Sequence, residues 1–435
     1  MNIAEMICDA GVVGAGGAGF PTHAKINAAA PEYVIANGAE CEPLLRVDQQ
    51  VMEFHADEVV EGLRLIMSHT KAKLGVIALK DHYEGAIAAL KRSLSGSGDI
   101  GLHVMRSCYP AGDEQQIVYE VSGRVVPTGG IPLDVGAVVS NVSTLMNVAE
   151  GSRHVPVTEK YVTVGGAVRN PATVKAPIGI SMKRLLEAAG GTTGECRYII
   201  GGPCMGSVVS DADIPVTKTT GGLIAIPEGH PLLHKKSDQI NMQLIKAVCC
   251  QCSLCTQMCP RNSLGLRVEP HKAMRSLAQG VDLLNGINGV FSCCDCGICT
   301  YYACNFGLKP SKVMGRLKAG LQKAGVKPKK EVYTETDRGF DTKKLPTSRL
   351  IHRLGIGEYD VPAPFDERLV ETDAVRIPLK MHIGAPSKPT VSVGQMVRKG
   401  ELIADIPKGA LGARVHASIC GTVTDVTDEY MEIKV

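Results

Sequence analysis

Short apolar runs alternate with amphipathic stretches along the N-terminal third of the chain. The runs Tyr33–Asn37, Leu74–Leu79 and Leu102–Arg106 have the length and apolar character of buried strands. Between them, Glu53–His69 and Tyr83–Leu94 place apolar residues at helical spacing. Because strands alternate with helices, we predict an α/β domain with a mostly parallel sheet that carries helices on its faces.

The pattern changes after this domain. Tyr161–Val164 and Tyr198–Ile200 have strand-like composition, and Met182–Ala189 has the pattern of a short helix. Gly165-Gly166 is typical of a turn. These features predict a small α+β unit of the β-grasp type at residues 156–235.

The α/β domain described first is predicted to span residues 1–155. Three further segments follow the β-grasp unit. Residues 240–325 carry closely spaced cysteines and end in a predicted helix, Ser311–Ala324. Residues 326–372 are charged and contain prolines, which indicates a solvated linker. Residues 373–435 are short apolar runs separated by glycines, which predict a small all-β module.

Composition narrows the class of protein. A chain of 435 residues is too long for one simple core, so several domains are expected. The formal net charge of +3 and an aromatic content of 4% give no indication of nucleic-acid binding. The N-terminus carries Glu5 and Asp9, unlike a secretory signal, and no apolar run approaches the ~20 residues of a membrane span. We therefore expect a cytoplasmic protein without a transmembrane segment.

The cysteines give the most specific signal. Ten of the 16 lie between Cys249 and Cys304, which indicates metal in a reducing compartment rather than a disulfide scaffold. The first run has the bacterial-ferredoxin spacing C-x2-C-x2-C-x3-C followed by Pro260, and the second run ends in an x4 step without a proline. The cysteines with ligand spacing are Cys249, Cys252, Cys255 and Cys259, then Cys293, Cys296, Cys299 and Cys304.

Two iron–sulfur clusters are the preferred interpretation of these runs. Three thiolates at x2 steps can surround one face of a cubane, and the fourth cysteine binds the other cluster in two-cluster ferredoxins. We therefore predict that Cys304 completes the first cluster and Cys259 the second. Zinc is a weaker alternative, because its cysteine pairs are usually separated by a longer spacer. Cys250 and Cys294 are expected to be bystanders, although either could replace a ligand. Two such centres predict a protein that transfers electrons.

A glycine-rich loop is a second candidate site. Gly14–Gly19 matches G-x-G-x-x-G, but the preceding Met1–Ala10 looks helical, so a standard dinucleotide-binding crossover is not expected. A flexible turn without a ligand is the alternative. Glycines nevertheless let a backbone approach a phosphate closely, and Lys25 can add positive charge.

Polar segments follow apolar runs at three other places: Asn37–Pro43, Tyr109–Glu114 and Ser140–Leu145. In an open parallel sheet, ligands bind outside the carboxyl ends of the strands. Together with the glycine loop, the three segments suit a flavin mononucleotide.

The same segments resemble two related families. The sequences GAGGAGFPTHAK (14–25), NGAECEP (37–43), YPAGDE (109–114) and NVSTL (141–145), followed by two ferredoxin runs, are similar to the flavin subunit of respiratory complex I and to the C subunit of the Rnf electron-transport complex. The NGAECEP form is closer to the Rnf type. The resemblance implies that FMN and NADH share one pocket, that electrons pass on to iron–sulfur clusters, and that the β-grasp unit is SLBB-like.

The order of the domains refines the resemblance. Residues 381–423 are similar to a barrel-sandwich (lipoyl-like) module, which precedes the flavin domain in Rnf subunits and comes last here. This order resembles the cobalamin reductase family of propanediol-utilisation microcompartments. It implies hydride transfer from NADH to FMN, single-electron transfer to two [4Fe–4S] clusters, and reduction of cob(III)alamin or cob(II)alamin toward cob(I)alamin. The chain has no Asp-x-His-x-x-Gly cobalamin loop, so corrinoid binding is expected to be transient.

The resemblance also implies a setting and partners. The protein would lie within or be attached to a bacterial microcompartment, with a shell protein and an adenosyltransferase as candidate partners. Three other functions stay open at this point: an Rnf-type protein that docks on a membrane pump, an iron–sulfur relay or adaptor of a protein shell, and a reductant for a radical enzyme. The position of the barrel-sandwich module argues against the first.

Single residues take roles by the same resemblance. Those expected to hold the phosphate and ribitol of FMN are Gly14, Gly16, Gly17, Lys25, Asn141 and Thr144. Those expected around its ring system are Asn37, Glu40, Glu42, Tyr109, Gly112 and Glu114. The two catalytic candidates are Glu40 and Phe20, the latter stacked on the nicotinamide or adenine of NADH.

Some alternatives and differences accompany these roles. Asn141 could instead cap a helix, and Phe20 could be a core residue. Ala15 and Ala39 stand where complex I subunits have an arginine and an acid. Without the arginine the phosphate loop is less positive, so weaker binding of FMN or NADH is expected.

Overall fold

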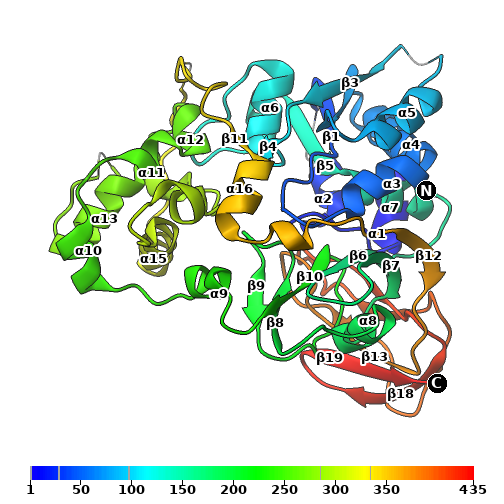
Figure 1. Cartoon of the computed structure of the whole chain (residues 1–435). Coiled ribbons are helices and arrows are strands. Elements are labelled where there is room, and N and C mark those ends of the chain that lie inside the picture. The colour runs from blue at the N-terminus through cyan, green and yellow to red at the C-terminus, as the bar shows by residue number, and fades with distance from the viewer. Residues whose placement is uncertain (1, 28–29, 97, 285, 334) are drawn as a thin grey trace.

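The computed structural model of the chain describes residues 2–27, 30–96, 98–284, 286–333 and 335–435 (Figure 1). The predicted N-terminal helix is present as α1 (Ile3–Asp9), while Met1 lies outside the described residues. The side chain of Ile7 is fully buried in the core of its own domain. Helix α1 therefore packs on the domain to which it belongs.

The first domain is built on a four-stranded parallel sheet with the order β3-β2-β1-β5. Its strands are β1 (Tyr33–Asn37), β2 (Leu74–Lys80), β3 (Ile100–Met105) and β5 (Ala137–Asn141). The chain moves outward from β1 on one side and returns on the other side to form β5. Asn37 and Asn141, the last residues of these neighbouring strands, are register partners. Open parallel sheets bind ligands where the strand order reverses in this way.

Helices cover both faces of this sheet. Helices α4 and α7 contact β1 from one face, and α6 contacts β1, β2 and β5 from the other. The predicted helix Glu53–His69 is in fact two helices, because the backbone leaves helical geometry at His55. The helical segments of the domain are α2 (Thr22–Asn27), α3 (Val47–Phe54), α4 (Ala56–Thr70), α5 (Glu84–Ser93), α6 (Glu114–Ser122), η1 (Pro132–Val135) and α7 (Val142–Ser152).

The β-grasp unit is a six-stranded mixed sheet with the order β12-β7-β6-β10-β8-β9. The prediction of a turn at Gly165-Gly166 is wrong, because both glycines lie in β6 and pair with the parallel strand β10. A Cβ atom on Gly166 would lie 2.0 Å from the carbonyl oxygen of Ala225, so the close approach of β10 requires glycine there. The elements are β6 (Glu159–Gly166), β7 (Ala172–Pro177), α8 (Met182–Ala188), β8 (Cys196–Ile200), β9 (Ser207–Val209) and β10 (Gly222–Pro227).

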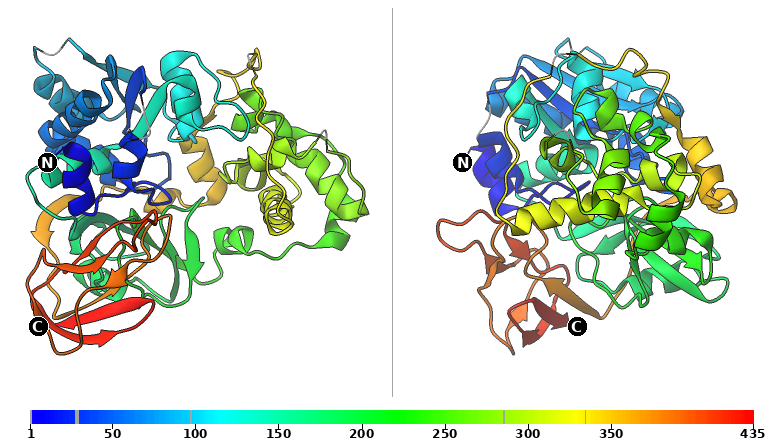
Figure 2. Two further views of the ribbon diagram at one scale, coloured as in Figure 1. Left: turned by 180° about the vertical axis from the view of Figure 1, so that it is seen from behind. Right: turned by 90° about the vertical axis from the view of Figure 1, so that its left-hand side faces the viewer.

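The cysteine-rich segment forms a lobe of short helices beside the sheet of the first domain, the predicted flavin domain (Figure 2). Its longest helix, α15, follows the second cysteine run and packs on α13. The helical segments are α9 (Pro231–Lys236), α10 (Met242–Val248), α11 (Leu254–Gln257), α12 (Pro260–Ser263), α13 (Pro270–Gln279), α14 (Asn288–Phe291), η2 (Cys299–Ala303) and α15 (Pro310–Lys323).

The prediction of a solvated linker at residues 326–372 is wrong for much of that segment. Strand β11 (Leu345–Pro346) pairs with β4 (Cys108–Tyr109), and β12 (Phe365–Leu369) adds an edge strand to the β-grasp sheet. Between them lie α16 (Thr347–Leu354) and η3 (Gly357–Tyr359). Leu350 and Leu354 of α16 are buried, because residues four apart lie on one helix face. The basic residues of α16, Arg349, His352 and Arg353, are exposed on its other faces.

The C-terminal module has two small sheets, with the orders β13-β19-β18-β15 and β14-β16-β17. It lies beside the β-grasp unit, on a different side from the cysteine-rich lobe (Figures 1 and 2). Its strands are β13 (Ala374–Pro378), β14 (Lys388–Pro389), β15 (Met396–Val397), β16 (Leu402–Asp405), β17 (Val415–His416), β18 (Gly421–Val426) and β19 (Tyr430–Lys434).

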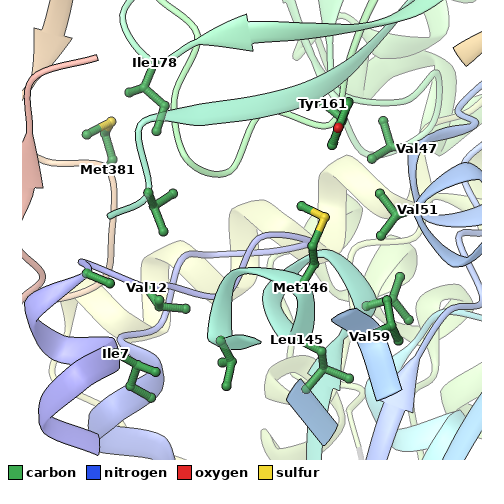
Figure 3. Packing of buried hydrophobic residues seen from close by; sticks show 14 of the residues in the cluster. Ile7, Val12, Val47, Val51, Val59, Leu145, Met146, Tyr161, Ile178 and Met381 are labelled. Atoms are coloured by element: carbon green, nitrogen blue, oxygen red, sulfur yellow. The ribbon is translucent and has the colours of Figure 1, made fainter. Parts of the chain in front are cut away.

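One hydrophobic core joins the flavin domain, the β-grasp unit and the C-terminal module. Leu145 and Met146 of α7 belong to the same buried cluster as Tyr161 and Ile178 of the β-grasp unit and Met381 of the module (Figure 3). The three parts are therefore held in a fixed arrangement by apolar burial. None of the described helices combines the length and the apolar character that crossing a bilayer requires.

The contact between α4 and α7 predicts a stability effect at Gly62. A Cβ atom there would lie 2.0 Å from the carbonyl oxygen of Leu145, whereas one at Gly320 on α15 would meet nothing within 4 Å. We expect Gly62→Ala to lower the free energy of unfolding by about 2 kcal/mol or more through overpacking. Gly320→Ala, the matched control, should raise it by up to ~1 kcal/mol through helix propensity. Urea midpoints followed by circular dichroism measure both; equal midpoints would contradict the close packing of α4 on α7.

Candidate functional site

Two adjoining cavities open at the carboxyl ends of β1 and β5. The larger, of about 450 Å³, is enclosed by the flavin domain, β-grasp loops and the second cysteine run. The smaller, of about 290 Å³, follows the glycine loop. The residues that line both are Gly16, Gly17, Asn37, Gly112, Glu114 and Asn141. All six were predicted as flavin-site residues, and the tertiary structure brings them together.

The glycine loop is held in place by its backbone. The N–H of Ala15 donates to Thr144 Oγ1 at 2.9 Å, and its carbonyl accepts from Lys160 Nζ at 3.2 Å. A Cβ atom on Gly16 would lie 2.6 Å from Asn141 Nδ2, whereas Gly17 faces open space. The loop and the N-terminus of α7 thus present a concave backbone surface beside the cavity, which fits a phosphate group.

Two asparagines at the strand ends organise the cavity wall. Asn141 Oδ1 accepts from the N–H of Ser143 at 2.9 Å, so the helix-cap alternative is realised, and Asn141 Nδ2 donates to Asp48 Oδ2 at 2.6 Å. Asn37 Nδ2 donates to the carbonyl of Gly112 at 3.0 Å. Both side chains therefore tie separate segments of the site to each other while lining both cavities.

The residues at the glycine-loop end lie in the smaller cavity. Gly14, Phe20, Lys25 and Thr144 line it together with the shared residues. Phe20 is 39% exposed, so it is not a core residue, and its ring is accessible for stacking. Lys25 Nζ donates to the carbonyl of Val139 at 2.5 Å and forms an ion pair with Glu114 at 3.3 Å. Its charge is thereby shared with a carboxylate at the cavity edge.

Glu40 lines the larger cavity with an unusual protonation equilibrium. Burial, together with the charges of Asp48 and Glu42, raises the pKa of its carboxyl to about 8, although Lys80 acts in the opposite direction. Its Oε1 accepts from the N–H of Glu42 at 2.9 Å. Burial likewise lowers the pKa of Lys160 to about 8, against the charges of Asp48 and Glu40. At neutral pH Glu40 is therefore largely uncharged.

One predicted residue, Tyr109, is placed differently from the expectation. It is absent from the lining of either cavity; it is buried, and its hydroxyl donates to the carbonyl of Cys296 at 2.7 Å and to Glu42 at 3.2 Å. Glu42 lines the larger cavity as predicted, and its carboxylate also accepts from the N–H groups of Cys204 and Met205 at 2.8 and 2.9 Å. These side chains hold the flavin domain, the β-grasp loop and the second cysteine run together.

Several residues of the site were not assigned from the sequence. Asp48 is buried beside Asn141 and Ser143, and Asp113 lines the larger cavity and binds Arg261 of α12. Asp113 lies within the YPAGDE segment and could have been found there; Asp48 lies in an amphipathic helix with no distinguishing motif. The β-grasp residues of the wall, such as Met205 and Thr219, reach it only through the tertiary fold.

The first cysteine run surrounds a small cavity of its own. The cysteines that line it are Cys249, Cys250, Cys252, Cys255 and Cys304. Four of them are the set predicted for the first cluster, with Cys304 coming from the second run. Cys250 and Cys252 are exposed, so this cavity lies near the solvent. The ligand roles themselves stay predictions.

The cysteines predicted for the second cluster lie deeper. Cys259 of the first run and Cys296 and Cys299 of the second run are buried, and Cys294 and Cys296 line the larger cavity. Within the described residues, no three His, Cys, Asp or Glu side chains converge tightly enough to hold a single metal ion. Four thiolates are the donor set of an iron–sulfur cluster, and two cysteines of the second run border the larger cavity, so a cluster held by this run would lie next to that cavity.

Four family models match consecutive parts of the chain. They are the Nuo51 FMN-binding domain at residues 7–150, the SLBB domain at 161–206, the 4Fe-4S dicluster domain at 248–309 and the RnfC barrel-sandwich hybrid domain at 367–434. The predicted kinds of domain are thus confirmed: an FMN-binding α/β domain with a parallel sheet, an SLBB-like β-grasp domain, a ferredoxin-like insert and a barrel-sandwich module. Their predicted bounds stay predictions.

Two relatives match the chain over almost its whole length. Proteins named cobalamin reductase PduS from Citrobacter freundii and from Salmonella typhimurium strain LT2 are each 39% identical to this chain, over 99% of it and 96% of their own length. The C component of the Na⁺-translocating ferredoxin:NAD⁺ oxidoreductase complex of Acetobacterium woodii is 35% identical over 59% of the chain and 57% of its own length. The chain is similar to the first pair over almost its whole length. It is therefore an electron-transfer oxidoreductase with flavin and iron–sulfur domains, and it belongs to the PduS cobalamin reductase family.

Proposed function

We propose that this protein uses NADH to reduce cobalamin through FMN and two [4Fe–4S] clusters. The observation that carries the proposal is the shared wall of the larger cavity, where Cys294 and Cys296 of the second run lie together with Gly16, Asn37 and Glu40 of the flavin site. FMN, when bound, accepts a hydride from a nicotinamide and releases its electrons singly. A flavin in this cavity would lie beside a predicted cluster loop, to which electrons accepted as a pair would pass one at a time.

The glycine-loop end would hold the phosphate of FMN. Gly17 faces open space, and Gly16 packs closely on Asn141, which caps the N-terminus of α7 at the same place. The hydrogen bond between Ala15 and Thr144 keeps the loop in this shape without an arginine. Phe20, at the open side, would position the nicotinamide or adenine of NADH by stacking.

Glu40 and its neighbours would set the charge of the cavity. A protonated Glu40 adds no negative charge beside Asp48 and can donate a hydrogen bond to a flavin or nicotinamide carbonyl. Lys160, when protonated, offsets Asp48. NADH carries two phosphate charges, so a less negative cavity favours its binding.

The acceptor is inferred from the relatives. The two proteins that match this chain over almost its full length are named cobalamin reductases. One NADH carries two electrons, which suffice to convert two cob(II)alamin molecules to cob(I)alamin with NAD⁺ and one proton as the other products. An association with a microcompartment, its shell protein or an adenosyltransferase stays a prediction based on the family resemblance.

The direct test is an anaerobic titration of the reconstituted protein with NADH, together with iron and flavin quantitation. We expect about eight irons and about one FMN per chain, because two cubanes hold four irons each. The flavin and cluster absorption bands should bleach together, and a subsequent addition of cob(II)alamin should restore them. Iron without flavin, or flavin that NADH cannot reduce, would contradict the dehydrogenase assignment and leave an iron–sulfur relay.

The protonation of Glu40 predicts a pH dependence. As the pH rises through about 8, Glu40 gains a negative charge and Lys160 loses a positive one, so the cavity becomes more negative in both ways. We expect the KM for NADH to rise by about fivefold between pH 7 and 9, which corresponds to about 1 kcal/mol. Glu40→Gln should reduce this rise, while Glu84→Gln, the same change on exposed α5, should retain it. An unchanged profile for Glu40→Gln would argue against the role of this carboxyl.

A further inference from the structure

A second large cleft lies between the β-grasp unit and the cysteine-rich lobe. Its volume is about 830 Å³, compared with about 450 Å³ for the larger cavity of the proposed flavin site, called the flavin cavity below. Three walls enclose it: β-grasp residues 204–208, which lead into β9; residues 233–240 around the end of α9; and α15 with the second cysteine run. Figure 1 shows α9 lying between β9 and α15. None of the flavin-site roles assigned above uses this cleft.

We propose that this cleft is the corrinoid-binding site, an inference that rests on the proposed function for the identity of the acceptor. Cobalamin would be held between β-grasp residues 204–208 and helix α15.

The cleft adjoins both redox sites. Met205 and Gly206 line the cleft and the flavin cavity alike. Gly297, which stands between Cys296 and Cys299 in the chain, lines the cleft on the side of the second run. A Cβ atom on Gly297 would lie 2.2 Å from the Tyr301 ring, which also lines the cleft, so glycine is required beside this ring. A molecule in the cleft would therefore lie beside the second cluster.

The walls of the cleft are held by buried polar contacts. Lys236, which is 7% exposed, donates to the carbonyls of Pro203 and Cys204, each at 3.0 Å. The hydroxyl of Tyr301 donates to the same Cys204 carbonyl at 3.0 Å. The β-grasp loop is thus tied to α9 and to the cysteine-rich lobe at one point, so the cleft exists before a ligand enters.

The lining matches the chemistry of a corrinoid. A corrin has broad apolar faces, a rim of amide groups and, in cobalamin, a phosphodiester on its nucleotide arm. Met205, just before β9, and Val208 of β9 are exposed apolar side chains of the β-grasp wall, at 54% and 40% exposure. Ser207 and the ion-paired Lys312 and Asp238 add polar groups that can meet amides. Arg316 on α15 has no hydrogen-bond or ion-pair partner among the described residues and can meet the phosphodiester.

The test uses a glycine on α15 that faces the cleft. A Cβ atom on Gly315 would meet nothing within 4 Å, so Gly315→Met fills the cleft without a backbone clash. Gly320→Met, on the same helix and outside the cleft lining, is the matched control. Binding of hydroxocobalamin to the reconstituted protein is measured by equilibrium dialysis without NADH, and iron and flavin contents report whether each variant is folded.

We expect Gly315→Met to raise the Kd for hydroxocobalamin by about tenfold or more and Gly320→Met to leave it unchanged. Arg316→Glu should raise it by about threefold to tenfold and reduce its dependence on salt. Equal Kd values for native protein, Gly315→Met and Arg316→Glu would overturn the proposal. So would the absence of hydroxocobalamin binding to the native protein, or a loss of NADH binding rather than corrinoid binding in Gly315→Met.

The outcomes separate this inference from the proposed function. If NADH bleaches the flavin and clusters but the cleft variants bind corrinoid normally, the reductase stands and the cleft is not its acceptor site. If Gly315→Met weakens corrinoid binding while NADH reduces nothing, the cleft stands and another reductant must be sought.

Discussion

The ion pair between Arg261 and Asp113 is the contact on which the arrangement of redox sites depends. Two guanidinium nitrogens of Arg261 lie 2.5 and 2.6 Å from the two carboxylate oxygens of Asp113, and the side chains are only 11% and 6% exposed. Arg261 follows Cys259 by two residues, and Asp113 lines the flavin cavity. Removing one partner of such a buried pair typically costs about 3–5 kcal/mol, since the other charge stays buried. The pair therefore fixes the end of the first cysteine run, with Cys259, against the flavin domain.

Neighbouring contacts extend this docking to the β-grasp unit. Glu42 of the flavin domain accepts from the backbone of Cys204 and Met205, and Tyr109 and Tyr301 reach the carbonyls of Cys296 and Cys204. The loop 202–206 thereby becomes the partition between the flavin cavity and the second cleft. The β-grasp unit therefore shapes both cavities, although it contributes no predicted ligand to either cluster.

The C-terminal module supports the flavin site from the opposite side. The N–H of Ile383 donates to the carbonyl of Gly19 at 3.1 Å, at the end of the glycine loop. Lys218, buried so that the pKa of its amine falls to about 7, donates to the carbonyls of Gly11 and Arg414 at 2.6 and 2.7 Å. The module therefore touches the glycine loop although it is the last part of the chain, and a shared apolar core holds it there.

The sequence by itself determined the local features. The cysteine spacing predicted which thiols of the first run gather, because ligands within one loop are close in the chain. The glycine loop and the strand ends predicted the flavin cavity, because the carboxyl ends of neighbouring parallel strands lie at one edge of the sheet. Only the tertiary structure decided the roles of Tyr109, Glu42 and Asp48, the packing of α16 and the position of the second cleft. Tyr109 and Cys296 are 187 residues apart and Glu42 and Cys204 are 162 apart. No local sequence pattern predicts these contacts, because they form only when one domain is buried against another.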